Sequence, residues 1–472
     1  MANIYPTSMA DALPSKARVC EAKERLEKAG VKYILSCWID LLGIPKTKPV
    51  PICEFEALCA GKGPQFAVHS ISFVPELGPA DSDQIPVPDL DSLVICPWDE
   101  TCAWVFADLW WEDKPYNLCP RQTLKRAVKD AEDAGFKAFC GIEPEFIAMR
   151  WENGQPVKAI DDDPAVGKGL RPRRQAFGYD AEYSIESMGF LGEMIDILNG
   201  LGWGVKDVVA EGAYSQFELD FTYTNVLEMA DRLVFLRVLL KEIAKNHGMF
   251  ITFMPKPTIG DWRSGAHINF SLTDTDGGGN IFEGEDGKFS EETYHAIGGI
   301  LKHGHAITAI ACSTVNSYNG LVPKVGGFEG GTVTWAPTQM AYGDNNRSCM
   351  VRLPQNRFCI ENRAADMCMN PYLSLALTTA ATIDGIQNKI DPGKPLNLDL
   401  YSLSIEEIKE ADITSLPRNL LEALEALQKS DFAREVLGES MMKQFFAYKM
   451  DEWDRYHQAV TEWEVEEYLR LY

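Results

Sequence analysis

The sequence predicts a protein of the α+β or α/β class with two domains, on three observations. Short apolar runs that carry polar residues at alternate positions have the period of half-buried strands. Longer segments between them have apolar residues at helical spacing. The stretch 115–120, bounded by prolines, separates a strand-rich beginning from the clearly helical segment 121–134. We therefore expect a small sheet-and-helix domain over residues 1–115 and a larger domain over residues 116–472.

The first domain is expected to begin with a helix and a hairpin. The helix is predicted over residues 16–30, where apolar and charged positions recur at helical spacing. The first strand of the hairpin, residues 33–40, carries Asp40 at its turn end. Residues 93–110 predict two more short strands.

The second domain is expected to alternate strands with helices. The predicted strands are 138–150, 204–223, 249–257, 265–272 and 348–362. The predicted helices are 184–201, 226–247, 291–311, 371–389 and 417–428, followed by an acidic, aromatic helical tail at 440–470.

The composition of the chain argues against some classes of binding partner. A net charge of −24 argues against a nucleic-acid backbone or an anionic membrane surface. No apolar stretch approaches the ~20 residues that span a bilayer, and the first residues do not resemble a signal peptide. The 12 cysteines form no C-x-x-C pairs, so we expect reduced thiols in a cytoplasmic protein.

Carboxylates recur at alternate positions of the strand-like segments. Glu143 and Glu145 stand two residues apart in an apolar run, and in a strand such residues project from the same face. Burying two adjacent carboxylates unpaired is costly, so a positive group is expected opposite them. Three further segments repeat the pattern, with Glu211, Gln216, Glu218 and Asp220; with His267, Asn269 and Ser271; and with Glu361 and Arg363.

Neighbouring strands of this kind would line one cavity with carboxylates and one imidazole. Oxygen ligands with at most one histidine suit Mg²⁺ or Mn²⁺ better than zinc. A solvated strand face is the alternative for any single segment, but four segments together favour a metal site. Arg347, Arg352 and Arg363 add guanidinium groups that match phosphate or carboxylate oxygens, with surface salt bridges as the alternative.

The order and spacing of these motifs resemble the glutamine synthetase family over almost the whole chain. The matching segments are 40–43, 141–146, 211–218, 253–257, 260–267, 316–318, 321–323, 346–348, 361–363 and 370–373. Segments 334–337 and 341–348 resemble more narrowly the branch that contains γ-glutamylmethylamide synthetases.

The resemblance implies an α+β fold and an assembly. The N-terminal domain would be β-grasp-like, and the larger catalytic domain would have a curved antiparallel sheet with flanking helices. The partner would be the chain itself, in a homododecamer of two stacked hexameric rings. Each active site would lie between subunits, with Asp40 supplied by the neighbour.

The resemblance also implies the ligands and their residues. ATP would be a substrate, with two or more Mg²⁺ or Mn²⁺ ions in each site. One ion would be held by Glu145, Glu211 and Glu218, and the other by Glu143, His267 and Glu361. Asn269, Ser271 and Arg352 fall where the family contacts ATP, Arg347 where it contacts the phosphates, and Arg363 and Gly265 where it binds glutamate.

Three departures from the family pattern affect the substrate end. Trp262 and Arg263 stand where most members have Asn-Gly, and Arg263 is expected to pair with a substrate carboxylate. Gly320 stands where most members have arginine. Glu329 is the candidate for the flap glutamate that shields the intermediate, with an ordinary loop residue as the alternative. Asp40, Glu329 and Arg347 are thus the expected catalytic residues.

Three functions stay open on these residues. The first is ATP-dependent ligation of glutamate to an alkyl or aromatic amine such as aniline, through a γ-glutamyl phosphate. Trp262, Phe328, Trp335 and Tyr179 would then form an apolar acceptor pocket, unless they are core residues. The second is a true glutamine synthetase that uses ammonia. The third is a non-catalytic structural or binding member of the family. Tyr401 lies near the tyrosine that some bacterial members adenylylate, and an ordinary loop tyrosine is the alternative.

Overall fold

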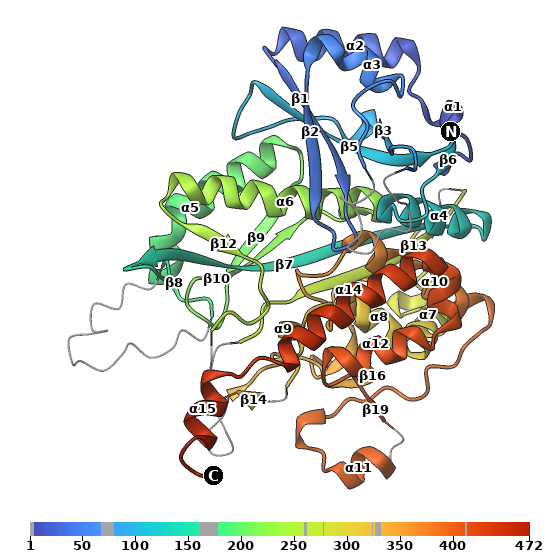
Figure 1. Cartoon of the computed structure of the whole chain (residues 1–472). Coiled ribbons are helices and arrows are strands. Elements are labelled where there is room, and N and C mark those ends of the chain that lie inside the picture. Colours follow the sequence, from blue (N-terminus) through green and yellow to red (C-terminus); the bar gives the residue numbers. More distant parts are fainter. Residues whose placement is uncertain are drawn as a thin grey trace.

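Two large β-sheets, one separate two-stranded sheet and the helices around them make up the described structure (Figure 1). It is a computed structural model and describes residues 4–67, 80–160, 178–258, 262–276, 278–322, 324–325, 332–410 and 413–472. The α+β arrangement expected from the sequence is confirmed.

The first sheet has six strands in the order β2-β1-β5-β3, with β4 and β6 also paired to β5. Its strands are β1 (Tyr33–Ile39), β2 (Pro45–Pro51), β3 (Ile85–Pro88), β4 (Val94–Ile95), β5 (Cys102–Trp111) and β6 (Lys114–Pro115). The helices beside it are α1 (Met9–Ala12), α2 (Lys16–Lys28) and α3 (Phe55–Cys59).

Alternation along β5 gives this sheet two buried faces. Ala103 and Val105 join a small core formed with α2 and α3. Trp104 and Phe106 point the other way and join the main core of the molecule. There the Trp104 ring meets Phe235 edge to face, at 5.6 Å between centroids. The sheet is therefore fixed to the rest of the chain by one of its faces.

The second sheet has eleven strands in the order β19-β16-β17-β18-β13-β7-β10-β9, with β8, β11 and β12 also paired to β7. The parallel pairing of β16 with β17 departs from the antiparallel sheet that the resemblance implies. The strands are β7 (Phe136–Glu152), β8 (Gln155–Lys158), β9 (Val205–Ala210), β10 (Gln216–Phe221), β11 (Thr224–Asn225), β12 (Phe250–Thr252), β13 (Ala266–Asp274), β16 (Gln339–Asp344), β17 (Cys349–Leu353), β18 (Ile360–Asn362) and β19 (Thr414–Ser415). A separate two-stranded sheet pairs β14 (Lys324–Val325) with β15 (Thr332–Val333).

The helices form two groups. In Figure 1, α4 and α6 lie between the two sheets, and both pack on β7. The helices of a second group pack against one another; this group includes α7, α8, α10, α12 and α14. The bounds are α4 (Pro120–Asp133), α5 (Ala181–Gly200), α6 (Val226–Asn246), α7 (Glu291–Lys302), α8 (Gly304–Ala311), α9 (Val315–Tyr318), α10 (Pro371–Gln387), α11 (Ile405–Glu410), α12 (Leu420–Gln428), α13 (Asp431–Leu437), α14 (Glu439–His457) and α15 (Glu462–Tyr468).

A buried arginine joins the two parts of the chain. The Arg121 guanidinium donates to Asp89 at 2.9 Å, to Asp108 at 2.8 Å and to Asp231 at 3.0 Å and 2.9 Å. Asp108 lies on β5, whereas Asp231 lies on α6. A charge this deeply buried needs such partners. The proposed boundary at residue 115 falls between the two sheets.

Several predicted elements are divided in the structure. The strand predicted at 204–223 is β9 and β10 with a turn between them, and Ser215 in that turn has a left-handed φ of 62°. The helix predicted at 291–311 is α7 and α8, because His303 leaves helical dihedrals with φ −101°. The His303 ring instead stacks on Phe432 at 3.7 Å and contacts Asp384 at 2.7 Å.

All twelve cysteines lie in the described residues as free thiols, as expected. Among the helices of the described ranges, none combines the length and apolarity needed to cross a membrane.

Candidate active site

Strand pairing in the large sheet brings the predicted polar residues together. His267 on β13 lies opposite Glu143 on β7. Glu218 on β10 lies opposite Glu145 on the same β7. Asn269 on β13 lies opposite Glu361 on β18. The strands that would line one cavity if they were neighbours are thus paired in the sheet.

Two groups of side chains converge closely enough to share an ion. In the first, ligand atoms of Glu143, His267 and Glu361 all lie within 4.8 Å of one another. In the second, the same holds for Glu145, Glu218 and His267. We call these five residues the double cluster; His267 belongs to both of its groups. Glu211 lies just after β9, outside both groups, and His267 takes the place that the resemblance gives to it.

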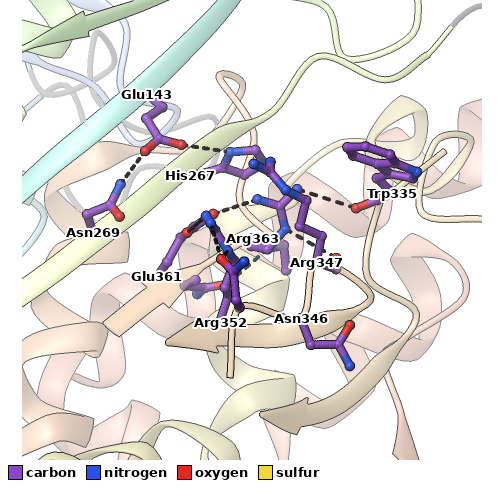
Figure 2. Close-up of polar contacts among 12 residues, drawn as sticks. Glu143, His267, Asn269, Trp335, Asn346, Arg347, Arg352, Glu361 and Arg363 are labelled. Carbon is purple, nitrogen blue, oxygen red and sulfur yellow. Dashed lines mark hydrogen bonds and ion pairs between the residues drawn. The ribbon is translucent and has the colours of Figure 1, made fainter. Parts of the chain in front are cut away.

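Hydrogen bonds order one half of the double cluster (Figure 2). Glu143 accepts from Asn269 Nδ2 at 2.9 Å and contacts His267 Nδ1 at 3.0 Å. Glu361, fully buried, accepts from Arg352 Nη1 at 2.6 Å and from Arg363 Nη1 at 2.5 Å. These partners offset the cost of burying the two carboxylates.

The other half of the double cluster carries raised pKa values, although Glu145 accepts a hydrogen bond from Gln216 Nε2 at 2.9 Å. Burial, with the charge of Glu211, raises the pKa of Glu145 to about 8. Burial, with the charges of Glu145 and Glu143, raises the pKa of Glu218 well above its usual range. The nearby Asp220 has its pKa raised to about 7, mainly by burial and then by Glu143. Added positive charge would relieve this repulsion.

Burial favours the neutral form of His267. Burial and the nearby Arg363 lower the pKa of His267, although Glu143 opposes them. At Glu143, burial by itself would raise the pKa. The interactions with His267 and then with Arg357 outweigh burial and lower the pKa of Glu143 to about 2. We assign the ring proton to Nδ1, because a carboxylate only accepts. This leaves Nε2 as an acceptor toward the second group, the arrangement that orients histidine ligands in metal sites.

The residues of the double cluster fit divalent cations. A side chain at Gly265 would place its Cβ 2.9 Å from Glu145 Oε1 and 3.2 Å from His267 Nε2, so glycine keeps that space open. Gln216 Oε1 is buried without a hydrogen-bond partner in the described structure. Oxygen ligands with a single imidazole suit Mg²⁺ or Mn²⁺.

Arg347 is the most available cation beside the double cluster. Its guanidinium lies 5.5 Å from the centroid of the Trp335 ring and makes no ion pair within the described ranges. Burial and the charges of Arg363 and Arg352 lower the pKa of Arg347. An anion placed among these three arginines would offset their repulsion, which fits a phosphate or carboxylate.

The Arg263 side chain is buried, and its guanidinium binds groups inside the protein. Its Nη2 lies 2.9 Å from Asp366 Oδ2 and donates to Ala364 O at 2.7 Å. Asp366 is fully buried, and Arg263 is only 8% exposed. From the sequence, Arg263 was expected to pair with a carboxylate of the substrate. The structure corrects this expectation, because the carboxylate that Arg263 contacts is that of Asp366 in the same chain.

Aromatic side chains surround one side of the site. The Trp262 and Trp335 centroids are 6.4 Å apart, with ring planes 29° apart. Tyr179, which is 79% exposed, donates its backbone N–H to Ala210, next to Glu211. Phe328 and Glu329 lie outside the described residues.

Two other expected site residues lie apart from these contacts. Asp40 Oδ1 accepts from the N–H of Leu42 at 2.9 Å and of Ile44 at 2.8 Å, and Oδ2 lies 3.2 Å from Lys46 Nζ. None of these described contacts involves the double cluster. Ser271 lies two residues beyond Asn269 on the same face of β13.

Arg357 was missed by sequence reasoning. Its Nη2 donates to Glu143 Oε1 at 3.0 Å and to Asn269 Oδ1 at 2.8 Å. It falls within the segment 348–362 predicted as one strand, but the structure ends β17 at Leu353 and starts β18 at Ile360. Its spacing of four residues from Glu361 was the available signal, because the two side chains lie 3.7 Å apart.

Comparisons with known proteins agree over nearly the whole chain. Residues 117–468 match the family model described as glutamine synthetase, catalytic domain. A glutamate–methylamine ligase of Methyloversatilis universalis is 35% identical over 458 residues, covering 96% of this chain and 99% of that protein. A glutamine synthetase of Pyrococcus furiosus is 36% identical over 466 residues, covering 93% and 97%. A solved GmaS/ADP complex has a TM-score of 0.85 and 31% identity, covering 95% and 99%.

The fold, the site and these similarities together define an ATP-dependent ligase of glutamate. More specifically, the chain belongs to the glutamine synthetase family.

Proposed function

We propose that the enzyme joins the γ-carboxylate of glutamate to the nitrogen of an organic amine through a γ-glutamyl phosphate. The double cluster carries the ligase part of this proposal, because it gathers buried carboxylates next to Arg347, which makes no ion pair in the described part of the chain. The Trp262–Trp335 pair supports an organic acceptor over ammonia. The relative named glutamate–methylamine ligase agrees with an amine acceptor.

Two divalent ions, Mg²⁺ or Mn²⁺, fit this proposal. Glu143, His267 and Glu361 would hold one, and Glu145 and Glu218 with Glu211 the other. When bound, such ions supply positive charge against phosphate oxygens.

In the first step, a γ-carboxylate oxygen of glutamate forms a bond to the terminal phosphorus of ATP. The bond from that phosphorus to the bridging oxygen breaks, and ADP leaves with the electron pair. Arg347 is positioned to bind the transferring oxygens, because its guanidinium has no ion pair in the described part of the chain. Asn269, Ser271 and Arg352 are the proposed ATP contacts, and Arg363 and Gly265 the proposed glutamate contacts.

In the second step, the amine nitrogen attacks the carbonyl carbon, and phosphate leaves with the electrons of the C–O bond. Asp40 of a neighbouring copy would accept the proton from nitrogen, a role typically worth ~10²–10⁴-fold. Burial raises the pKa of Asp40, which makes it a stronger base. We propose Glu329 as the residue that shields the intermediate from water.

The proposed assembly is a homododecamer of two hexameric rings in the cytoplasm. The proposal rests on the family, and it supplies each site with Asp40 from a second copy.

An amine panel tests the acceptor. Phosphate release would be measured with ATP, glutamate, Mn²⁺ and either ammonium, methylamine, longer alkylamines or aniline. We expect at least one organic amine to exceed ammonium in kcat/KM by tenfold or more. Equal or better turnover with ammonium than with every organic amine would overturn the proposal. That result would favour the second candidate, a glutamine synthetase, which relatives of that name at 36% identity also support.

A further inference from the structure

Both carboxylate oxygens of Glu143 are engaged by side chains of the same chain. Oε1 accepts from Asn269 Nδ2 at 2.9 Å and from Arg357 Nη2 at 3.0 Å. Oε2 lies 3.0 Å from His267 Nδ1. A divalent ion at Glu143 must therefore share an oxygen with the Arg357 guanidinium, and the two positive charges repel each other.

The two arginines that bind Glu361 are fixed by further hydrogen bonds. Arg352 lies on β17 and also donates its Nε to Asn345 Oδ1 at 3.0 Å. Arg363 directly follows β18 and donates its Nε to the carbonyl of Arg347 at 3.2 Å. Their side chains are only 11% and 5% exposed. Both guanidinium groups therefore belong to the fixed frame of the site (Figure 2).

Arg357 differs from these two arginines in its place and in its exposure. It lies in the connection between β17 and β18, and its side chain is 40% exposed. Its other hydrogen bonds go to side-chain amide oxygens, that of Asn269 at 2.8 Å and that of Asn356 at 3.5 Å. An ion pair at such exposure contributes little to stability, so Arg357 can leave Glu143 without disturbing the fold.

Asn269 places Arg357 beside the proposed contacts to ATP. The Asn269 amide is shared, because its Nδ2 donates to Glu143 while its Oδ1 accepts from Arg357. Asn269 and Ser271 lie on the same face of β13, and both are proposed to contact ATP. A guanidinium fork matches phosphate oxygens. The phosphates of ATP are therefore a suitable second partner for Arg357.

We propose that Arg357 is a displaceable internal counter-ion, which competes with a divalent ion for Glu143 and moves to the phosphates of ATP when that ion binds. Arg357 thereby couples the binding of this ion to the binding of the nucleotide. The inference rests on the ion site and the ATP contacts of the proposed function, and it does not depend on which amine is the acceptor.

Mn²⁺ binding in the absence of nucleotide tests the competition. Free Mn²⁺ would be measured by electron paramagnetic resonance during titration of the wild type, of Arg357→Gln and of Arg357→Lys. We expect Arg357→Gln to bind one class of Mn²⁺ about threefold to tenfold more tightly, because the competing charge is gone. Arg357→Lys keeps the charge and should stay close to wild type.

Arg434→Gln is the matched control for the loss of an arginine. The Arg434 side chain is 39% exposed, and its Nη1 lies 2.7 Å from Glu439 Oε2. It thus resembles Arg357 in exposure and in its glutamate partner, but it lies on α13. Its loss should leave Mn²⁺ affinity unchanged. Glu145→Gln removes a carboxylate of the other group, so the tightened class of Mn²⁺ should persist when Glu145→Gln is combined with Arg357→Gln.

Binding of the non-hydrolysable analogue β,γ-imido-ATP tests the move to phosphate. At saturating Mn²⁺, we expect Arg357→Gln to bind the analogue about tenfold more weakly, because a charge-assisted hydrogen bond is lost. Coupling between two ligands is reciprocal. The factor by which the analogue tightens Mn²⁺ binding should therefore be smaller in Arg357→Gln than in wild type.

The outcomes separate this inference from the proposed function. Unchanged or weaker Mn²⁺ binding in Arg357→Gln overturns the competition, and unchanged binding of the analogue overturns the move to phosphate. Either result leaves amine ligation standing. A wild type that binds no Mn²⁺ instead overturns the ion site of the proposed function.

Discussion

Gly320 and Arg263 are a complementary pair of departures from the family pattern. A Cβ at Gly320 would lie 2.5 Å from Arg263 Cβ and 2.7 Å from its Cγ and Cδ. The missing side chain at position 320 therefore leaves the space that Arg263 fills. The Arg263 guanidinium in turn neutralises the buried Asp366, so the two unusual residues depend on each other.

Gly320→Ala should destabilise the enzyme. The clash is with the stem of Arg263, which its bonds to Asp366 and Ala364 hold in place. Overpacking of this kind costs ~1–3 kcal/mol, which thermal or urea unfolding would detect.

Gly189→Ala is the matched control for that measurement. Gly189 lies in α5, where a Cβ would meet nothing within 4 Å. Alanine there should stabilise slightly, because glycine is a poor helix former. Equal stability of the two alanine variants would contradict the proposed dependence of Gly320 on Arg263.

At the scale of strands, the sequence predicted which strand faces form the site, but it did not place every residue of the site. Alternation placed Glu143 and Glu145 on one face of a strand, and pairing with β13 and β10 then brought their partners opposite. Alternation could not place Glu211 or Arg357, because neither lies in a strand. Glu211 lies in the connection between β9 and β10, and Arg357 in the connection between β17 and β18. Connections have no fixed period, so only the folded backbone locates such residues.

Sequence reasoning was also limited for Arg263. A cation beside the substrate motif suggests a substrate carboxylate, and only the structure reveals Asp366 as the carboxylate that it meets. The two residues are 103 positions apart in the chain, and no local pattern predicts such a pair.

The crowded carboxylates of β7 and β10 predict a pH dependence of stability in metal-free enzyme. The pKa of Glu145 is about 8 in the folded protein, against ~4.3 in an unfolded chain. A carboxyl with a raised pKa stabilises the fold fully below its unfolded value and loses that contribution as pH rises through the folded value. In EDTA, the melting temperature should therefore fall between about pH 5 and pH 8.

Mn²⁺ should reverse this trend, because metal binding requires ionised carboxylates and strengthens as pH rises. Glu145→Gln, measured in EDTA, should show a shallower fall, since it removes the group with the raised pKa. A metal-free melting temperature that rises over this range, or an unchanged slope in Glu145→Gln, would contradict the assigned electrostatics.

For the whole molecule, the contacts of Asp40 bear on the proposed assembly. The turn that carries it packs against the same chain, where Asn370 Nδ2 donates to the Asp40 carbonyl at 3.3 Å and to the Leu41 carbonyl at 3.1 Å. Arg237 Nη1 also donates to the Gly43 carbonyl at 3.4 Å. These contacts hold the turn in place, and none of those described for the Asp40 carboxylate reaches the double cluster of its own chain. These contacts agree with the proposal that Asp40 acts at the active site of a neighbouring copy.

Complementation between two inactive variants tests this arrangement. Asp40→Asn keeps an oxygen that can accept from Leu42 and Ile44 but loses the basic carboxylate, whereas Arg347→Ala removes the proposed phosphate contact. Each variant alone should lose ~10²-fold or more in kcat. Oligomers that contain both should regain turnover, because some interfaces then combine an intact Asp40 with an intact Arg347. Arg347→Ala mixed with itself is the control, and light scattering would verify that all mixtures assemble alike. Mixed oligomers no more active than either parent would show that Asp40 serves its own chain or does not serve catalysis.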